Sequence, residues 1–323
     1  MDMLNRLTGS WRGIVGGGCA GVLVVSGIVA ATAGSGGAGG SRPGMTIRAA
    51  EFTWTAAAIT NAILEGIAAS HPGLGVSQIV STPLDPTAAW AGAARGNIDL
   101  LTEVALPNQQ PLAEQAKNRV KLIDQTYGNA VQGWFVPSYV VQPGGPAAGL
   151  SSITQLNQYA NVFGDKLIDA DPGWVTTKQN TLRLKAYGIK YEDVSAGAND
   201  EIAQLERSYR LHQPILIYLY EPHWVFARYK LVQLQEPNPY KPGCFTGSGD
   251  KCAIPTLSAW IAASNTIAAG APKFYAMLKR VKIPLVQMEQ MLQQVDVNKV
   301  PAGTAAQQWL NAHRAQVNAW NKG

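Results

Sequence analysis

The chain has 323 residues, of which 46% are apolar and 15% are charged. This length is enough for about two domains of ordinary size with a large core. The formal net charge of +5 comes from 26 Lys and Arg against 21 Asp and Glu, and no basic cluster has the density of a nucleic-acid-binding surface, so nucleic acid is excluded as the expected partner.

The first 33 residues have the layout of a secretory signal. Arg6 and Arg12 precede a long uncharged run of small and apolar residues, which ends in an Ala-x-Ala sequence at 31–33 where cleavage is expected. Two alternatives stay open. The run is long enough for an uncleaved membrane anchor, and Cys19 is a possible lipid-attachment site, although its Gly-rich context lacks the leucine-like start of a lipoprotein box. We expect a secreted, periplasmic protein.

A first α/β lobe is predicted to begin at Met45, after a flexible Gly- and Ser-rich linker at 34–44. Short strands and helices alternate along the next segments: strands at 46–50, 75–80 and 97–104, and helices at 55–70 and 88–96. This alternation is typical of a doubly wound sheet.

A second lobe is predicted after the apolar segment 131–141. Pro137 lies in the middle of this segment, where a central strand does not tolerate proline but a connection between lobes does. The alternation then resumes, with strands at 166–171 and 191–194. Three helices accompany them: one that starts at 151, one that ends near 187, and one at 199–211.

Residues 213–237 carry the most informative pattern. Segment 214–220 is short, apolar and rich in β-branched and aromatic residues, which predicts a buried strand that Pro222 ends. Tyr220, Glu221 and Trp224 therefore lie at or just past the carboxyl end of that strand, where open α/β sheets bind ligands. Aromatic residues on both sides of a proline can serve either a pocket wall or a core.

The remaining chain is predicted to be a loop at 238–255 followed by helices at 259–269, 271–280, 285–295 and 305–320. Cys244 and Cys252 lie eight residues apart in the loop, and in an oxidising compartment they would close it as a disulfide. A metal-binding pair is the alternative, but no cluster of His, Asp or Glu accompanies them at ligand spacing.

Three of these segments resemble glycine-betaine-type substrate-binding proteins of ABC importers. Residues 213–237 are similar to that family's W-x-P-H-W-x-F-A-x-Y-x-L-x-x-L-x-x-P stretch, with Tyr220 in place of the first Trp. Residues 131–141 are similar to its G-x-x-V-P-x-Y stretch, and 305–320 to its C-terminal tail.

The resemblance covers about residues 46–320 and implies a two-lobed, type II-like periplasmic-binding-protein fold. Each lobe would be a doubly wound sheet, with the ligand cleft between the lobes. The expected segments are 45–138 and 233–323 for the first lobe and 139–232 for the second.

The candidate site is a set of aromatic rings at strand-to-helix turns, namely Trp54, Trp174 and Tyr220. A quaternary ammonium has no N–H to donate, so a protein holds it by ring faces. The resemblance also implies that the turn before Val175 and Thr176 presents their backbone N–H groups to a ligand carboxylate, as a helix N-terminus can.

Besides Tyr220, the sequence departs from the family's pattern at three further places. Ala105-Leu106-Pro107 stands where many relatives have a W-x-P turn, so that ring is missing. Gln109 falls near a carboxylate-binding His of some relatives, and Ala56 stands where choline binders often have Asp.

Three further residues enter the candidate site with an alternative for each. Glu103 and Glu221 either face the cleft, where they would favour a cation without a carboxylate, or are solvated or hinge residues. Trp134 either enters the pocket or packs within its strand, and His223 is expected to be a hydrogen-bonded hinge residue.

No enzyme motif is present in the sequence. It contains no G-x-S-x-G, H-E-x-x-H or C-x-x-C motif, no P-loop, and no G-x-G-x-x-G after a strand. We therefore expect a monomeric binding protein without cofactor or metal, which captures a betaine-like quaternary amine and delivers it to ABC permease subunits. The alternatives are the same fold binding choline, a polyamine or an amino acid, a membrane-anchored sensing domain, and an enzyme on the same scaffold.

Overall fold

The structure is a computed structural model that describes residues 44–244 and 251–322. The predicted signal, anchor and lipid-attachment site, and the linker up to residue 43, lie outside the described residues. Within the described ranges, no helix is both long enough and apolar enough to cross a bilayer.

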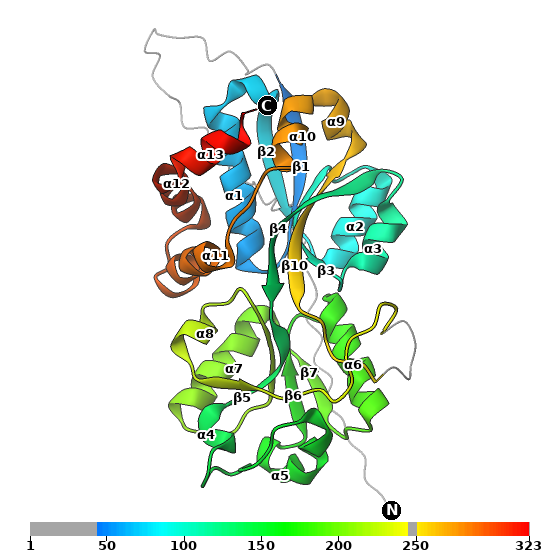
Figure 1. Cartoon of the computed structure of the whole chain (residues 1–323), viewed down its shortest axis with the longest axis vertical. Helices are drawn as coiled ribbons and strands as arrows, with labels where there is room; N and C mark the ends of the chain where they lie inside the picture. Colours follow the sequence, from blue (N-terminus) through cyan, green and yellow to red (C-terminus); the bar gives the residue numbers. More distant parts are fainter. Residues whose placement is uncertain (1–43, 245–250, 323) are drawn as a thin grey trace, which may run out of the picture. The chain divides into compact units, whose positions relative to one another are not determined.

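The first sheet has the strand order β2-β1-β3-β10-β4 and defines lobe 1 (Figure 1). Its strands are β1 (Met45–Glu51), β2 (Val76–Pro83), β3 (Leu100–Leu106), β4 (Val120–Ala130) and β10 (Leu257–Ser264). Strand β1 pairs in parallel with β2 and β3, whereas β10 is antiparallel to both β3 and β4.

Helices cover both faces of the first sheet. Helix α1 (Thr55–Ser70) packs on one face together with the C-terminal helices, and α2 (Pro86–Arg95) and α3 (Gln110–Ala116) lie on the other (Figure 1). The apolar stripe of α1 shows why: Ile59, Ile63 and Ile67 recur every four residues and are fully buried.

The second sheet has the order β7-β6-β8-β5-β9 and defines lobe 2. Its strands are β5 (Gln132–Pro137), β6 (Lys166–Asp169), β7 (Glu192–Ser195), β8 (Ile217–Tyr220) and β9 (Leu231–Gln233). Its helical segments are α4 (Ser138–Val141), η2 (Ile153–Tyr159), α5 (Ala160–Phe163), α6 (Val175–Tyr187), α7 (Ala198–Arg210) and α8 (Val225–Arg228). One core cluster includes α6 and the other α7 and α8, so lobe 2 is also a two-sided α/β unit.

The chain passes between the sheets at two places, and neither coincides with the segments expected from sequence. Strand β4 ends at Ala130 in lobe 1 and β5 begins at Gln132 in lobe 2, so the first crossover is at Val131 rather than after residue 138. Pro137 is the last residue of β5, where it ends a strand instead of interrupting one. The return to lobe 1 lies between β9 and β10, later than residue 232.

The prediction of a helix over 259–269 is wrong for its first half. Residues 257–264 form β10, and only then does α9 (Asn265–Gly270) begin. The run Ala-Trp-Ile-Ala-Ala is apolar throughout because β10 is central in its sheet, and a short continuous apolar run does not distinguish a buried strand from a buried helix.

The C-terminal segment packs on the α1 face of lobe 1. It contains α10 (Pro272–Leu278), α11 (Leu285–Leu292), the π-helical segment η3 (Gln293–Val297), α12 (Ala302–Ala312) and α13 (Arg314–Trp320). The helix expected over 305–320 is thus two helices, separated at His313, which has non-helical dihedral angles.

The structure joins Cys244 and Cys252 by a disulfide with a Cα–Cα distance of 6.3 Å. The pair lies in the connection between β9 and β10. Among the described residues, no group of three or more His, Cys, Asp or Glu side chains is arranged to hold a metal ion.

Candidate functional site

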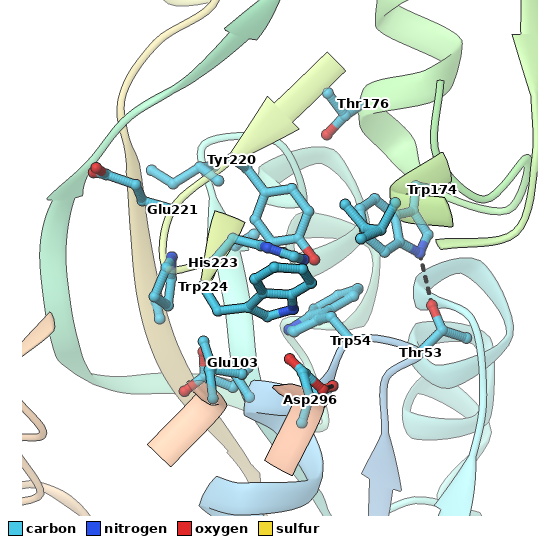
Figure 2. Close-up of a pocket in the computed structure, with 18 of the residues that line it drawn as sticks. Thr53, Trp54, Glu103, Trp174, Thr176, Tyr220, Glu221, His223, Trp224 and Asp296 are labelled. Atoms are coloured by element: carbon cyan, nitrogen blue, oxygen red, sulfur yellow. Dashed lines mark hydrogen bonds between the residues drawn. The ribbon is translucent and has the colours of Figure 1, made fainter. Parts of the chain in front are cut away.

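A cavity of about 430 Å³ is lined by residues of both lobes. Eight of the nine residues predicted for the site line it: Trp54, Glu103, Gln109, Trp174, Val175, Thr176, Tyr220 and Glu221. Figure 2 shows the aromatic side chains in its centre, with the side chains of Glu103 and Asp296 on the side of lobe 1.

Three aromatic rings from the two lobes meet in this cavity. The rings of Trp54 and Trp174 are 5.2 Å apart between centroids at an interplanar angle of 84°. Those of Trp174 and Tyr220 are 5.3 Å apart at 71°. Rings that meet nearly at right angles form adjacent walls of a box rather than a stack, which is the arrangement that surrounds a cation with ring faces.

The backbone explains why these rings come together. Trp54 is the N-cap residue of α1, Trp174 is the N-cap residue of α6, and Tyr220 is the last residue of β8. Each therefore lies just after or at the end of a strand of its lobe. Because the carboxyl ends of parallel strands meet at one edge of a sheet, rings placed there converge on the cleft.

The N-terminus of α6 supplies hydrogen-bond donors to the same cavity. Trp174 has the extended backbone of an N-cap residue but makes no side-chain cap hydrogen bond. The first N–H groups of a helix have no acceptor within the helix, so those of Val175 and Thr176 can serve an anion. Both residues line the cavity.

Gln109 is held in place by one of its two polar groups. Its Oε1 accepts a hydrogen bond from Trp90 Nε1 at 2.8 Å, and its side chain is 2% exposed. The amide nitrogen is therefore the group that remains for a ligand, and it can only donate.

Glu103 contributes a buried carboxylate from β3. Its Oε1 accepts from Thr60 Oγ1 at 2.9 Å, and its Oε2 accepts from the Tyr127 hydroxyl. Burial raises the pKa of this carboxyl group to about 7, and the two hydrogen bonds limit the rise because they favour the charged form. Its backbone φ is 56°, in the left-handed region that non-glycine residues rarely adopt.

Asp296 contributes a second carboxylate, from η3. Its Oδ1 accepts from Thr55 Oγ1 at 2.7 Å, which ties it to the residue after Trp54. Burial raises its pKa, while the Thr55 hydrogen bond and the charge of Lys299 oppose the rise.

Direct hydrogen bonds join the lobes across the cleft. Trp174 Nε1 donates to Thr53 Oγ1 at 2.7 Å (Figure 2). Asn108 Nδ2 in lobe 1 donates to Thr176 Oγ1 at 2.7 Å and to Gln132 Oε1 at 3.0 Å in lobe 2. The lobes are thus held in contact by neutral, largely buried polar groups.

The turn before α6 also approaches lobe 1 closely. A Cβ atom on Gly173 would lie 2.9 Å from the Cβ of Asp85, the N-cap residue of α2. Only glycine fits at this contact unless the backbone of one lobe moves.

Trp134, the ninth predicted residue, is not among those that line the cavity. Its side chain is fully buried in the core of lobe 2, where Nε1 donates to Asn180 Oδ1 at 2.9 Å. The Arg183 guanidinium lies 4.3 Å from its ring centroid. Side chains alternate along β5, and both of its faces are buried, with Trp134 in the core cluster that includes α6 and Phe135 in the one that includes α7 and α8. Trp134 therefore packs within the core of lobe 2 and is not part of the site.

Glu221 lines the cavity but directs its carboxylate elsewhere. Oε2 accepts from the backbone N–H of Val131 at 3.0 Å, at the crossover between the lobes. Figure 2 shows this carboxylate pointing away from the rings of Tyr220 and Trp174. This geometry corresponds to the hinge alternative. His223, next to it, lines the cavity, and burial lowers its pKa to about 4, so it is neutral at pH 7.

Sequence reasoning missed several residues that line the cavity. These are chiefly Thr53, Asn108, Tyr127 and Asp296. Thr53 could have been found from the sequence, because it lies next to Trp54 after the first predicted strand. Tyr127 is on β4, which was not predicted as a strand. Asp296 follows the helix predicted at 285–295, far from the other site residues in the chain. Neither has a local motif.

Solved structures of known proteins share this fold. Lactococcal OpuAC in a closed, liganded conformation with glycine betaine has a TM-score of 0.71 and 21% identity, covering 86% of this chain and 99% of that one. An ABC-transporter choline-binding protein in complex with choline has a TM-score of 0.72 and 15% identity, covering 85% and 91%. The glycine betaine/L-proline-binding protein ProX from Borrelia burgdorferi has 0.72 and 20%, covering 85% and 96%. These likenesses confirm the two-lobed binding-protein fold.

The sequence itself also matches a family model. Residues 45–312 match the substrate-binding domain of the ABC-type glycine betaine transport system, a family of transport proteins rather than of enzymes. The chain therefore belongs to the family of substrate-binding domains of ABC-type glycine betaine transport systems.

Proposed function

We propose that this protein captures a small quaternary amine in the cavity between its lobes and delivers it to the permease of an ABC importer. The observation that carries this proposal is the box formed by Trp54, Trp174 and Tyr220. Each ring face that a desolvated cation contacts contributes roughly 0.5–2 kcal/mol, and this attraction requires no hydrogen bond from the ligand.

Ligand capture would work by closure of the lobes. Trp54 belongs to lobe 1, whereas Trp174 and Tyr220 belong to lobe 2, so a complete box exists only when the lobes meet. A ligand that contacts both lobes binds this state better than an open one and shifts the population towards it. The permease would then recognise the closed surface.

The location of the protein follows from the same proposal. A binding protein that serves an importer acts outside the cytoplasmic membrane, which agrees with the secretory signal expected in residues 1–33. A role in binding rather than catalysis agrees with the family and with the absence of enzyme motifs from the sequence.

A matched pair of ligands tests the proposal. Choline and its uncharged carbon isostere, 3,3-dimethylbutan-1-ol, have nearly the same shape and differ in charge. We expect a thermal-shift assay of the purified protein to show a concentration-dependent increase in Tm with choline or glycine betaine and none with the isostere. Equal shifts with choline and its isostere, or no shift with any quaternary amine, would overturn the proposal.

A further inference from the structure

Asp296 is a charged residue of the cavity that the aromatic box does not account for. It is the acidic residue of η3, a five-residue segment that continues α11 at the far end of the chain. Thr55 Oγ1 donates to its Oδ1 at 2.7 Å, and within the described residues its Oδ2 makes no hydrogen bond. Figure 2 shows the Asp296 side chain directed towards the aromatic rings from the lobe 1 side.

The cavity as a whole is acidic. Four acidic residues line it, Glu103, Glu206, Glu221 and Asp296, although the Glu221 carboxylate is turned towards the backbone of Val131. Lys299 is the one lysine or arginine among the lining residues of the described chain. Lys299 Nζ donates to the backbone oxygen of Asp296 at 2.6 Å, and its charge favours the ionised form of the Asp296 carboxyl group. Burial is the main cause that raises the pKa of the Tyr220 hydroxyl, and the charges of Asp296 and Glu103 add to this rise.

We propose that Asp296, supported by Glu103, determines ligand specificity within the proposed function, so that the site prefers a quaternary amine with a hydroxyl group over one with a carboxylate. This inference depends on the proposed capture of quaternary amines. It adds a residue from the C-terminal segment to the site and names the chemistry that this residue selects.

Asp296 distinguishes ligands by the charge of their second polar group, which is neutral in an alcohol and negative in a carboxylate. An ionised carboxylate only accepts hydrogen bonds, so the free Oδ2 of Asp296 can accept one from a hydroxyl group. A ligand carboxylate placed there would have no proton to donate and would be repelled. Like charges a few ångströms apart interact strongly when water is excluded, so this repulsion disfavours betaines in addition to the hydrogen bond that favours the alcohol.

The N-terminus of α6 is the competing site for a carboxylate. A betaine that binds with its carboxylate on Val175 and Thr176 avoids Asp296, and its cation still lies in the box. Specificity is therefore a difference between two affinities, and the ratio of the choline and glycine betaine dissociation constants measures it.

The test compares three proteins by isothermal titration calorimetry with choline and glycine betaine. In the unaltered protein we expect the lower Kd for choline. Asp296→Asn keeps the shape of the side chain and an oxygen for Thr55, but removes the charge. We expect it to weaken choline binding about tenfold and to leave glycine betaine binding unchanged or tighter, so the Kd ratio shifts by tenfold or more.

Glu289→Gln is the matched control. Glu289 is a partly buried acidic residue of α11, in the same C-terminal segment, but it does not line the cavity. Its neutralisation changes the net charge by the same amount, and we expect the Kd ratio to stay as in the unaltered protein. Thermal melts check that both variants fold.

The outcomes separate the two proposals. If the unaltered protein binds quaternary amines but Asp296→Asn leaves the Kd ratio unchanged, the specificity role of Asp296 is wrong and the proposed function stands. The same conclusion follows if the unaltered protein prefers glycine betaine, or if Glu289→Gln shifts the ratio as much. If no quaternary amine binds, the proposed function fails, and the inference fails with it.

Discussion

Lobe 1 and lobe 2 both place aromatic rings at the carboxyl ends of their strands, but they face the cleft with opposite polarity. Lobe 2 adds the free N–H groups at the start of α6 to the rings of Trp174 and Tyr220. Lobe 1 adds the carboxyl groups of Glu103 and Asp296 to the ring of Trp54.

The difference arises from the chain's path. In both lobes the strand ends supply the rings, because that is where residues converge in an α/β sheet. Only lobe 1 also receives the C-terminal segment, whose η3 brings Asp296 against Thr55. The rings would hold any cation of suitable size, whereas the different polar groups of the two lobes select among such ligands by their second functional group.

Removal of a ring should have the largest effect on ligand affinity. Trp174→Ala removes a wall of the box and also the cross-lobe hydrogen bond to Thr53. A loss of about 2 kcal/mol from the ring alone corresponds to roughly 30-fold in Kd, measured by calorimetry with choline or glycine betaine.

Trp174→Phe separates the two contributions. It keeps a ring face but has no N–H for Thr53, so we expect an affinity between those of the unaltered protein and Trp174→Ala. Unchanged affinity in the alanine variant would show that the box is not the binding site.

The contact between the lobes should depend next on Asn108. Asn108→Leu keeps the approximate volume but leaves the buried side chains of Gln132 and Thr176 without this partner. An unsatisfied buried polar group costs about 1–3 kcal/mol. We expect small-angle scattering of the unliganded variant to give a larger radius of gyration, and the Kd to rise.

Gln110→Ala is the control for Asn108. Gln110 lies nearby at the start of α3, and its side-chain amide donates to Glu114 Oε1 on the surface. Surface changes of this kind are usually worth less than about 0.5 kcal/mol. If both variants scatter alike, the Asn108 contacts do not hold the lobes together.

The acidic side of lobe 1 should make ligand affinity depend on pH. Glu103 has a pKa of about 7 because it is buried, so it is largely neutral at pH 6 and ionised at pH 8. A permanent cation such as choline favours the ionised form, so its affinity should rise by a few fold between these pH values. Glu103→Gln should abolish this part of the pH dependence, and its persistence in the variant would assign it to another group.

The same group affects stability with the opposite sign. The folded pKa of Glu103 lies above its ordinary value, so the folded protein retains this proton while the unfolded chain has lost it, and the contribution to stability falls as pH rises from about 4.5 to 7. The Tm of Glu103→Gln minus that of the parent protein should therefore be more positive at pH 8 than at pH 5. Comparison with the parent protein removes the contribution of Asp169, whose pKa burial raises to about 7 in lobe 2.

The smallest effect on affinity is expected at the disulfide. Cys244 and Cys252 do not line the cavity, and they close a loop with a sequence separation of only 8. Replacement of both by Ser should lower the free energy of unfolding by about 2 kcal/mol, since short loops gain least from closure. Denaturant unfolding measures this loss, and the Kd should not change. A large change in Kd would mean that this connection contributes to the cleft.

The structure agrees with the sequence-based predictions for features that a short segment of the chain sets by itself. The positions of Trp54, Trp174 and Tyr220 at strand ends follow from short apolar runs that stop at turns, and the structure brings all three rings together. The helix predicted to end near residue 187 is α6, which ends at Tyr187 before Gly188 in the left-handed region. These features depend on residues adjacent in the chain.

Other features depended on which elements become neighbours. Residues 257–264 are a strand because β3 and β4 lie on either side of them. Trp134 is a core residue because both faces of β5 are covered by the rest of lobe 2. Asp296 reaches the cavity through a contact with Thr55, 241 residues earlier in the chain. The two α/β units, the family and the positions of the rings could be predicted from the sequence, because hydrophobic period and turn residues act locally. The crossover positions and the acidic side of the cleft could not, because they depend on side chains that meet only after the chain has folded.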